Sequence, residues 1–366
     1  MTGTLTAKRS TGNGADGLDH EEVVVRRGHR SGAQMIVAIH STVLGPALGG
    51  ARMWNYGSSL EGLRDALRLA GAMTLKAAAA GLDLGGGKGV ICTDSGSPTG
   101  SARRDLLLDF GDLVESLDGR YVTAEDIGTG TEDIAVIAER TSHVVGLDPE
   151  LGGSGDPSPL TALGVEAAMR ACVRHRLGAA DLAGLSVAVI GLGHVGSRLA
   201  RLLARAGADL AVCDIDPGKR SIARELGATW LDPDHAPLAD CEVLAPCALG
   251  GVIDRTNVEL LRCAVVCGSA NNVLSDEDIA EELATRGVLY APDFIANAGG
   301  LISVYREIRG YGPERVRELV LGIEGAMERI LARAKRSSIT PLAAARELAL
   351  ERLQAARDGS LELAAS

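Results

Sequence analysis

The amino-acid sequence predicts an α/β fold of two domains, of which the second is a doubly wound parallel sheet. The chain has 366 residues, a length that suits two domains of ordinary size. Its second half alternates short apolar runs with amphipathic helical segments, as parallel strands joined by helical crossovers require. A stretch rich in Gly, Pro and Ser at residues 152–159 divides the two halves and is the expected hinge between the domains.

Composition limits the classes of protein to which the chain can belong. Its 37 basic and 48 acidic residues give a net charge of −11, which disfavours nucleic-acid partners because phosphate backbones need a basic surface. No apolar run reaches the roughly 18 residues of a membrane span, and no signal peptide is recognisable. We therefore expect a cytoplasmic protein with no membrane partner. None of the seven cysteines forms a CxxC pair and no HExxH occurs, so we expect no metal site.

The first half is predicted to begin with a flexible, polar leader over residues 1–20. Short apolar runs then predict strands over residues 22–27, 34–40, 89–93, 120–124 and 142–146. Apolar side chains at helical spacing predict a long helix over 59–80 and a second helix over 103–117. A short segment leads from the first helix into the glycine-rich run Gly85-Gly86-Gly87-Lys88.

The second half shows a more regular alternation. Helices are predicted over residues 160–176, 195–206 and 217–226, and strands over residues 185–190, 209–213, 243–245, 264–267 and 288–290. The tail over 313–358 is helical, and Thr340 followed by Pro341 predicts the start of a last helix. We expect domains at 21–150 and 151–312. We expect the helices in 313–366 to pack back on the first domain or on a subunit interface.

A glycine-rich turn in the second half predicts a dinucleotide site. It directly follows an apolar strand and opens a helix, with the sequence Gly191-Leu192-Gly193-His194-Val195-Gly196. Such a turn lets a pyrophosphate approach the backbone at the positive end of the helix. Asp214 ends the next strand and is the expected ligand of the ribose hydroxyls, which favours NAD over NADP. The alternative interpretation is a purely structural glycine turn.

Three residues in the first half are candidates for acid–base chemistry. Lys76 ends an apolar helix, Lys88 follows three glycines, and Asp126 ends a strand next to a glycine-rich turn. Burial beside a second ammonium lowers the pKa of a lysine toward neutrality, which would make it a usable general base. Taken singly, each residue is more typical of a surface lysine or a loop-capping aspartate, but three such residues beside glycine-rich turns, in a chain with a predicted NAD site, favour a catalytic role.

Short motifs along the chain resemble those of one enzyme family. In chain order they are GPALGG at 45–50, GAMTLK at 71–76, GGGK at 85–88, TAEDIGT at 123–129, APCALGG at 245–251, ANN at 270–272, YAPDF at 290–294 and NAGG at 297–300. Together they resemble the amino acid dehydrogenases that act on Glu, Leu, Phe and Val. The resemblance implies an N-terminal substrate and oligomerisation domain, a Rossmann-type NAD domain and a homo-oligomer.

The resemblance also implies roles for the candidate catalytic residues. Lys76, with main chain around Gly50, would hold the substrate α-carboxylate. Lys88 would be the general base that activates water, and Asp126 would exchange protons with the substrate amine. The implied reaction is the reversible oxidative deamination of an L-amino acid to a 2-oxo acid and ammonia, with NAD as the cofactor.

For the second half, the resemblance implies that Asn271 contacts the substrate carboxylate and the nicotinamide, with Asn297 near the same pocket. Thr161 and Ala248 fall where family members touch the cofactor. One departure is Pro157, which stands where some relatives have a serine that contacts a phosphate.

Four apolar residues fall at the family's side-chain pocket, and they predict a branched-chain substrate: Leu48, Ala124, Leu301 and Val304. The glutamate enzymes carry a lysine at Leu48, and the phenylalanine enzymes typically carry a glycine at Ala124. Valine, leucine and isoleucine are not ranked, because one methylene supplies only about 1–3 kcal/mol of discrimination. The alternatives are a phenylalanine dehydrogenase and, from a different class, a catalytically silent NAD-binding scaffold or sensor.

Overall fold

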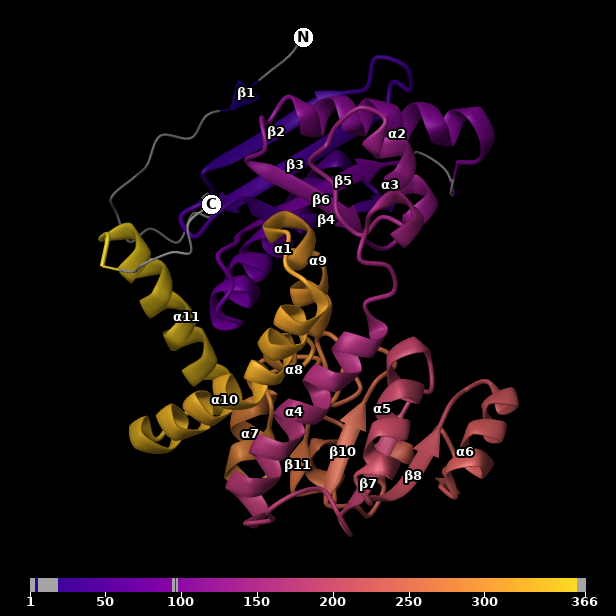
Figure 1. The fold of residues 1–366 in the computed structure, drawn as a ribbon, viewed down its shortest axis with the longest axis vertical. Coiled ribbons are helices and arrows are strands. Elements are labelled where there is room, and N and C mark those ends of the chain that lie inside the picture. Colours follow the sequence, from indigo (N-terminus) through magenta and orange to yellow (C-terminus); the bar gives the residue numbers. More distant parts are fainter. Residues whose placement is uncertain (1–3, 6–18, 94–95, 97, 361–366) are drawn as a thin grey trace. The chain divides into compact units, whose positions relative to one another are not determined.

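The computed structural model describes residues 4–5, 19–93, 96 and 98–360 of the chain (Figure 1). The predicted flexible leader, 1–20, lies outside these residues except at 4–5 and 19–20. The chain divides into two compact units. Unit 1 comprises Met1–Gly155, Glu307–Arg309 and Ala349–Ser366, and unit 2 comprises Asp156–Arg306 and Gly310–Leu348.

Unit 1 is built on a mixed six-stranded sheet with the order β1-β2-β3-β5-β4-β6. The strands are β1 (Thr4–Leu5), β2 (Glu22–Arg27), β3 (Gln34–Ser41), β4 (Ala47–Trp54), β5 (Gly85–Cys92) and β6 (Tyr121–Glu125). Pairing is antiparallel from β1 through β2 and β3 to β5, whereas β4 runs parallel to both β5 and β6. Strand β4, which lies between β5 and β6, therefore ends at the same edge of the sheet as these two strands.

Helices cover both faces of this sheet. Helix α1 (Ser59–Ala79) buries Ala66 and Ala70 against Ile36 of β3 and Val90 of β5. Helices α2 (Gly100–Glu115) and α3 (Thr131–Ala138) pack on the opposite face. That second core includes Phe110, Leu113, Ile134, Ala47, Ala51 and Tyr121. Because side chains alternate along a strand, the even-numbered residues of β4 and β5 point to the α1 face.

In unit 1, two elements were missed and two predictions were wrong. Strand β4 and helix α3 were not expected, and the predicted strand at 142–146 is only a bridge between Thr123 and Val144. Strand β5 begins at Gly85, so the triple glycine lies inside a strand and not before it. Its glycines are required by close packing: a Cβ at Gly85 would lie 1.8 Å from the Ser41 carbonyl oxygen, and one at Gly86 would lie 2.1 Å from the Thr74 nitrogen.

Unit 2 is a doubly wound α/β domain, as predicted. Its six parallel strands have the order β12-β11-β10-β7-β8-β9, so the first strand lies near the centre and the chain winds outward on both sides. They are β7 (Ser186–Ile190), β8 (Asp209–Cys213), β9 (Thr229–Trp230), β10 (Val243–Pro246), β11 (Val265–Val266) and β12 (Leu289–Tyr290). The carboxyl end of β7 leads into the predicted glycine turn.

The helices that accompany this sheet include several that the sequence did not predict. They are α4 (Ser158–Leu177), α5 (His194–Arg205), α6 (Arg220–Leu226), α7 (Ile279–Thr285), α8 (Asp293–Ala296), α9 (Gly299–Arg309), α10 (Pro313–Ser337) and α11 (Pro341–Arg357). Of these, α7, α8 and α9 were missed because they are short or begin at glycines. The predicted start of α11 is confirmed, since the Thr340 hydroxyl accepts a hydrogen bond from the Ala343 N–H at 3.2 Å.

The C-terminal helices divide between the two units, which differs from the expected grouping of 313–366. Helix α10 packs along α4 inside unit 2, where Ile323 fills the space above Gly164. The end of α11 belongs to unit 1, because Leu353 packs with Leu44 and Ala78. There Arg352 donates to the Leu82 carbonyl at 2.6 Å and pairs with Asp83 at 2.6 Å.

Candidate active site

A buried ion pair is the centre of the candidate site in unit 1. Lys88 lies in β5 with 6% of its side chain exposed, and its Nζ is 2.8 Å from Oδ2 of Asp126. Burial lowers the pKa of Lys88 below the ordinary lysine value, although the carboxylate of Asp126 opposes this shift. For Asp126, burial favours the neutral acid, but the charges of Lys88 and Arg52 outweigh burial and lower its pKa. The pair thus combines an anion with an ammonium that gives up its proton more easily than usual.

The sheet of unit 1 brings several predicted site residues to the same face as Lys88. Leu48 and Gly50 lie in β4 at even-numbered positions, and Gly50 pairs with Ala124 of β6. A Cβ at Gly50 would lie 2.8 Å from the Cβ of Asp126, so this position needs a glycine. Leu48 is 2% exposed and Ala124 is half-buried, so this face is apolar beside the ion pair. Lys76 lies in the last turn of α1, the helix that covers this face, and is half-buried.

Arg52 is a further member of the cluster that sequence reasoning missed. Its Nε lies 2.7 Å from Oδ2 of Asp126, and its Nη1 lies 2.8 Å from Oδ2 of Asp65 in α1. Asp65 also accepts hydrogen bonds from the Tyr56 hydroxyl and from Arg68, each at 2.8 Å. Recognition of 47–54 as a strand would have revealed Arg52, because it lies two residues beyond Gly50 and therefore on the same face.

The glycine turn of unit 2 has the geometry that a dinucleotide phosphate requires. Gly191 has φ +97°, and a Cβ at Gly196 would lie 1.9 Å from the Gly191 carbonyl oxygen. A Cβ at Gly193 would meet no described atom within 4 Å, so the backbone there is accessible. Among the described residues no side chain caps the N-terminus of α5, which begins at the exposed His194 and continues with Val195. Its first N–H groups can therefore hold a phosphate, so the turn fits the predicted cofactor.

Asp214 lies directly after β8 and bonds to this turn. Its Oδ2 accepts a hydrogen bond from the Leu192 N–H at 2.7 Å, and its Oδ1 accepts one from the Asp216 N–H at 2.9 Å. The carboxylate is thus fixed beside the turn, a role that the sequence did not predict. Ala248 also lies against the turn, since its Cβ would be 2.7 Å from a Cβ at Gly191.

Two other predicted residues of unit 2 form a direct contact. The Asn297 amide donates a hydrogen bond of 2.7 Å to Oδ1 of Asn271, and Asn297 is 5% exposed whereas Asn271 is exposed. Because its oxygen accepts this bond, Asn271 presents its amide N–H groups elsewhere. Asn271 can therefore bind a ligand through its amide N–H groups, and the buried Asn297 holds the Asn271 side chain in place.

The remaining predicted residues of unit 2 lie at α4 and α9. The Thr161 hydroxyl donates to the Pro157 carbonyl at 3.0 Å, and a Cβ at Gly300 would lie 3.1 Å from that hydroxyl. Pro157 has no N–H of its own to offer a phosphate. Leu301, which is buried, and Val304, which is half-buried, follow Gly300 in α9.

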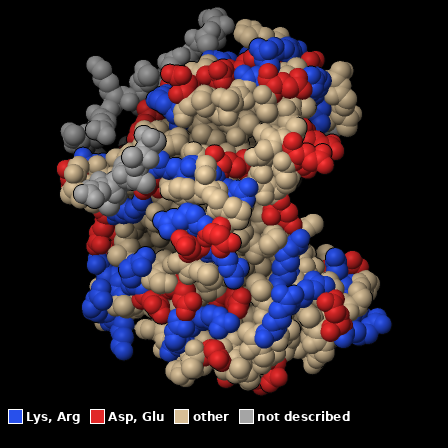
Figure 2. Space-filling view, viewed as in Figure 1, with Lys and Arg blue, Asp and Glu red and all other residues tan. Residues whose placement is uncertain are grey.

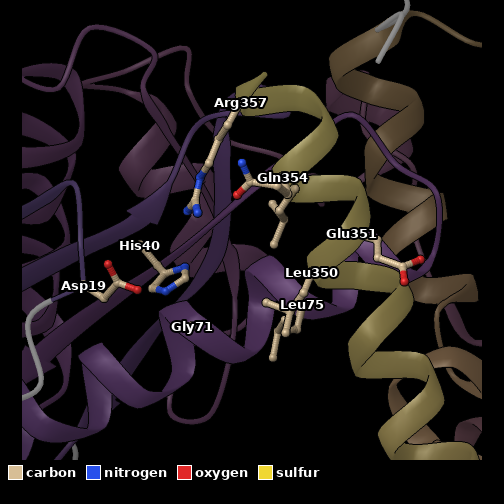
Figure 3. A pocket seen from close by; sticks show the side chains of 9 residues that line it. Asp19, His40, Gly71, Leu75, Leu350, Glu351, Gln354 and Arg357 are labelled. Carbon is tan, nitrogen blue, oxygen red and sulfur yellow. The ribbon is translucent and has the colours of Figure 1, made fainter. Parts of the chain in front are cut away.

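A separate hollow of about 480 Å³ lies in unit 1 between α1 and the end of α11 (Figure 3). It is lined by Asp19, His40, Gly71, Leu75, Leu350, Glu351, Leu353, Gln354 and Arg357. None of these described residues is one of the candidate catalytic residues. His40 is engaged with the Thr74 hydroxyl at 2.9 Å. The hollow is therefore distinct from the Lys88 cluster.

Comparison with known proteins agrees with this architecture. The family model described as "Glu/Leu/Phe/Val dehydrogenase, dimerisation domain" matches residues 20–143, and "Glutamate/Leucine/Phenylalanine/Valine dehydrogenase" matches residues 218–359. A leucine dehydrogenase of Bacillus subtilis is 43% identical over 93% of each chain. A valine dehydrogenase of Streptomyces virginiae is 44% identical over 92% of this chain and 95% of the relative. The crystal structure of L-tryptophan dehydrogenase from Nostoc punctiforme superposes with a TM-score of 0.84 and 37% identity, covering 93% of this chain and 97% of that one.

Proposed function

The chain belongs to the Glu/Leu/Phe/Val dehydrogenase family and is an amino acid dehydrogenase; we propose that its substrates are branched-chain L-amino acids and its cofactor is NAD. The reaction is the reversible deamination of valine, leucine or isoleucine to the 2-oxo acid and ammonia. The observation that carries this proposal is the Lys88–Asp126 ion pair, which lies on the same sheet face as the apolar residues Leu48 and Ala124. The named relatives that act on leucine and on valine support the same substrate class.

Each polar residue of unit 1 has one task in the proposed mechanism. Lys76 and the main chain at Gly50 bind the substrate α-carboxylate. Asp126 accepts a proton from the substrate ammonium and returns one to the departing ammonia. Lys88, as the neutral amine, removes a proton from water while the water oxygen attacks the iminium carbon. Burial lowers the pKa of Lys88, which supports this base role because a larger fraction of the amine is neutral at a given pH.

Unit 2 is proposed to bind the cofactor, which when bound accepts a hydride from the substrate α-carbon. The turn from Gly191 to Gly196 would bind the pyrophosphate, and the fixed carboxylate of Asp214 would bind the ribose hydroxyls. A 2′-phosphate would meet that carboxylate, so NAD is favoured over NADP. Ala248 and Thr161 would line the cofactor site, and Asn271, supported by Asn297, would bind both the carboxamide and the substrate.

Substrate choice is proposed to follow from Leu48 and Ala124, together with Leu301 and Val304 of unit 2. A buried leucine at position 48 offers no positive charge to a side-chain carboxylate, so glutamate is disfavoured as a substrate. Aromatic amino acids are the competing class, since the chain is similar in fold to a tryptophan dehydrogenase. The methyl group of Ala124 narrows the site and favours aliphatic side chains.

The test is NADH formation with a panel of valine, leucine, isoleucine, phenylalanine, tryptophan and glutamate. We expect the highest kcat/KM with one of the three branched-chain amino acids. Lys88→Ala should reduce turnover by about 10²–10⁴-fold and leave NAD binding intact, whereas Lys335→Ala, on the exposed side of α10, should behave as wild type. A wild-type preference for phenylalanine or tryptophan would overturn the substrate assignment. Retention of a tenth of the turnover by Lys88→Ala would overturn the role of Lys88.

We also propose that the enzyme is a cytoplasmic homo-oligomer that binds neither nucleic acid nor membrane. The description of the family model as a dimerisation domain supports self-association through unit 1. On the face shown in Figure 2, acidic and basic side chains are interspersed, and no extended basic surface gathers there. No helix in the described part of the chain is long and apolar enough to cross a membrane. Light scattering of the purified protein tests the proposal, and a monomeric mass would contradict it.

A further inference from the structure

We propose that Arg52 is a positioning residue of the reaction: its guanidinium fixes the Asp126 carboxylate beside Lys88 and prevents that carboxylate from pairing with Lys88 alone. The inference rests on the proposed roles of Lys88 and Asp126, and it adds a third group that touches neither substrate nor cofactor.

Both bonds to Asp126 end on the same oxygen. Oδ2 accepts from Lys88 Nζ at 2.8 Å and from Arg52 Nε at 2.7 Å. Within the described part of the chain, no donor is bonded to Oδ1 of Asp126. With Oδ2 held from two sides, the carboxylate cannot rotate freely, and Oδ1 remains as the oxygen that can receive a proton from the substrate amine. Asp126 is also the more exposed partner, at 24% against 6% for Lys88.

Arg52 can hold Asp126 in this way because Arg52 is itself held. Its side chain is 17% exposed, and its Nη1 bonds to Asp65 Oδ2 at 2.8 Å. The planar guanidinium therefore joins carboxylates from two different elements, α1 and the segment after β6, through two of its nitrogens. Tyr56 and Arg68 hold Asp65 in turn. A lysine at this position would carry the charge but could not reproduce the rigid planar bridge.

The electrostatic consequence concerns Lys88. Burial is the largest influence on the pKa of Lys88 and lowers it; Asp126 and the more distant Asp65 raise it, and Arg52 lowers it. Asp126 faces Lys88 from the segment after β6, Asp65 faces it from α1, and Arg52 faces it from β4. Loss of Arg52 removes a repelling charge and leaves Asp126 to pair with Lys88 alone. Both effects raise the pKa of Lys88, so a smaller fraction of the base is neutral at a given pH.

The experiment compares Arg52→Met and Arg52→Lys with wild type, with Arg104→Met as the matched control. Arg104 forms an ion pair with Glu139 on the opposite side of the sheet, so its loss removes an arginine–carboxylate pair without touching the cluster. We expect Arg52→Met to lower kcat by about 10- to 100-fold, with little change in the KM for NAD. The acidic limb of kcat/KM should move to higher pH. In Arg52→Lys, we expect the acidic limb of kcat/KM to lie close to its wild-type pH, because the positive charge is kept, whereas kcat should stay well below the wild-type value. Arg104→Met should match wild type in both.

A second measurement needs no turnover, so it separates this proposal from the proposed function. Competitive acetylation across a pH series, read for each lysine by mass spectrometry, reports the pKa of Lys88 directly. We expect that pKa to be higher in Arg52→Met than in wild type, and unchanged in Arg104→Met. Thermal denaturation identifies any variant that does not fold. If Arg52→Met does not fold, Arg52→Lys is compared with wild type instead. An unmoved Lys88 pKa and an unmoved acidic limb in folded variants would overturn the proposal, even if the enzyme deaminates amino acids as proposed.

Discussion

Lys88 Nζ and Asp126 Oδ2 lie 2.8 Å apart, although Lys88 lies in β5, Asp126 directly follows β6, and β4 separates these two strands. The pair is possible because the strand between them carries Gly49 and Gly50. A Cβ at Gly49 would lie 1.7 Å from the Gly87 carbonyl oxygen, and one at Gly50 would lie 2.4 Å from that of Glu125. Gly49 thus lets β4 lie close to the backbone of β5, and Gly50 leaves room for Asp126 to reach Lys88 on the α1 face.

The ion pair predicts the pH dependence of the wild-type enzyme. Lys88 must be neutral to act as a base, and its pKa is lowered from 10.5, chiefly by burial. We therefore expect kcat/KM for deamination to rise with pH and to level off below pH 10.5. Asp126, whose pKa is lowered, stays ionised over the same range and adds no second acidic limb near neutrality. Initial rates across pH test this, and a limb at or above the ordinary lysine pKa would contradict it.

Cofactor preference should depend on Asp214. In Asp214→Ala with Ile215→Arg, we expect the ratio of kcat/KM for NAD to that for NADP to fall by about tenfold or more, because a charged hydrogen bond contributes roughly 1.5–3 kcal/mol. Ile215 is 91% exposed, so its replacement does not disturb packing. Asp216→Ala is the matched control, since that carboxylate caps the following turn through the Gly218 N–H at 2.8 Å. An unchanged ratio would show that Asp214 serves the turn alone.

Side-chain selection should respond to Ala124. We expect Ala124→Gly to raise activity on phenylalanine relative to valine by about tenfold, corresponding to the ~1.4 kcal/mol that one methyl contact supplies. Leu48→Ala in addition should enlarge the effect, because both residues lie on the α1 face of neighbouring strands. Ala51→Gly removes a methyl group from the opposite face of β4 and is the control. An equal ratio of activity on phenylalanine to activity on valine in wild type and Ala124→Gly would show that Ala124 does not select the substrate side chain.

The glycines of β5 should matter for stability. A Cβ at Gly86 would lie 2.1 Å from the Thr74 nitrogen and 2.5 Å from the Ala70 oxygen, both of them backbone atoms of α1. We expect Gly86→Ala to lower the free energy of unfolding by about 1–3 kcal/mol. Gly322→Ala on the exposed side of α10, where a Cβ meets no described atom within 4 Å, should be neutral or stabilising by up to about 1 kcal/mol. Urea denaturation of both variants distinguishes these outcomes, and a Gly86→Ala protein as stable as wild type would refute the packing argument.

The sequence predicted unit 2 better than unit 1, for physical reasons. The strands and first helices of unit 2 carry apolar residues at regular spacing. The glycines of the turn from Gly191 to Gly196 follow a short sequence pattern that can be recognised locally. Strand β4, with the sequence ALGGARMW, was missed because its glycines interrupt the apolar alternation that identifies a strand. Those glycines are set by contacts with residues far along the chain, which no local pattern records. Arg52 was missed for the same reason, since its place beside Asp126 follows only from the strand register.

The packing of Leu353 on Leu44 and the bond from Arg352 to Asp83 have a consequence for biosynthesis. The ribosome makes the sheet of unit 1 first but releases residues 349–360 only after all of unit 2. Until then Leu44 and Ala78 lack their apolar cover and Asp83 lacks one of its arginine partners. Unit 1 therefore completes its fold only after unit 2 has been synthesised, and until then the nascent chain exposes an apolar site that chaperones can bind.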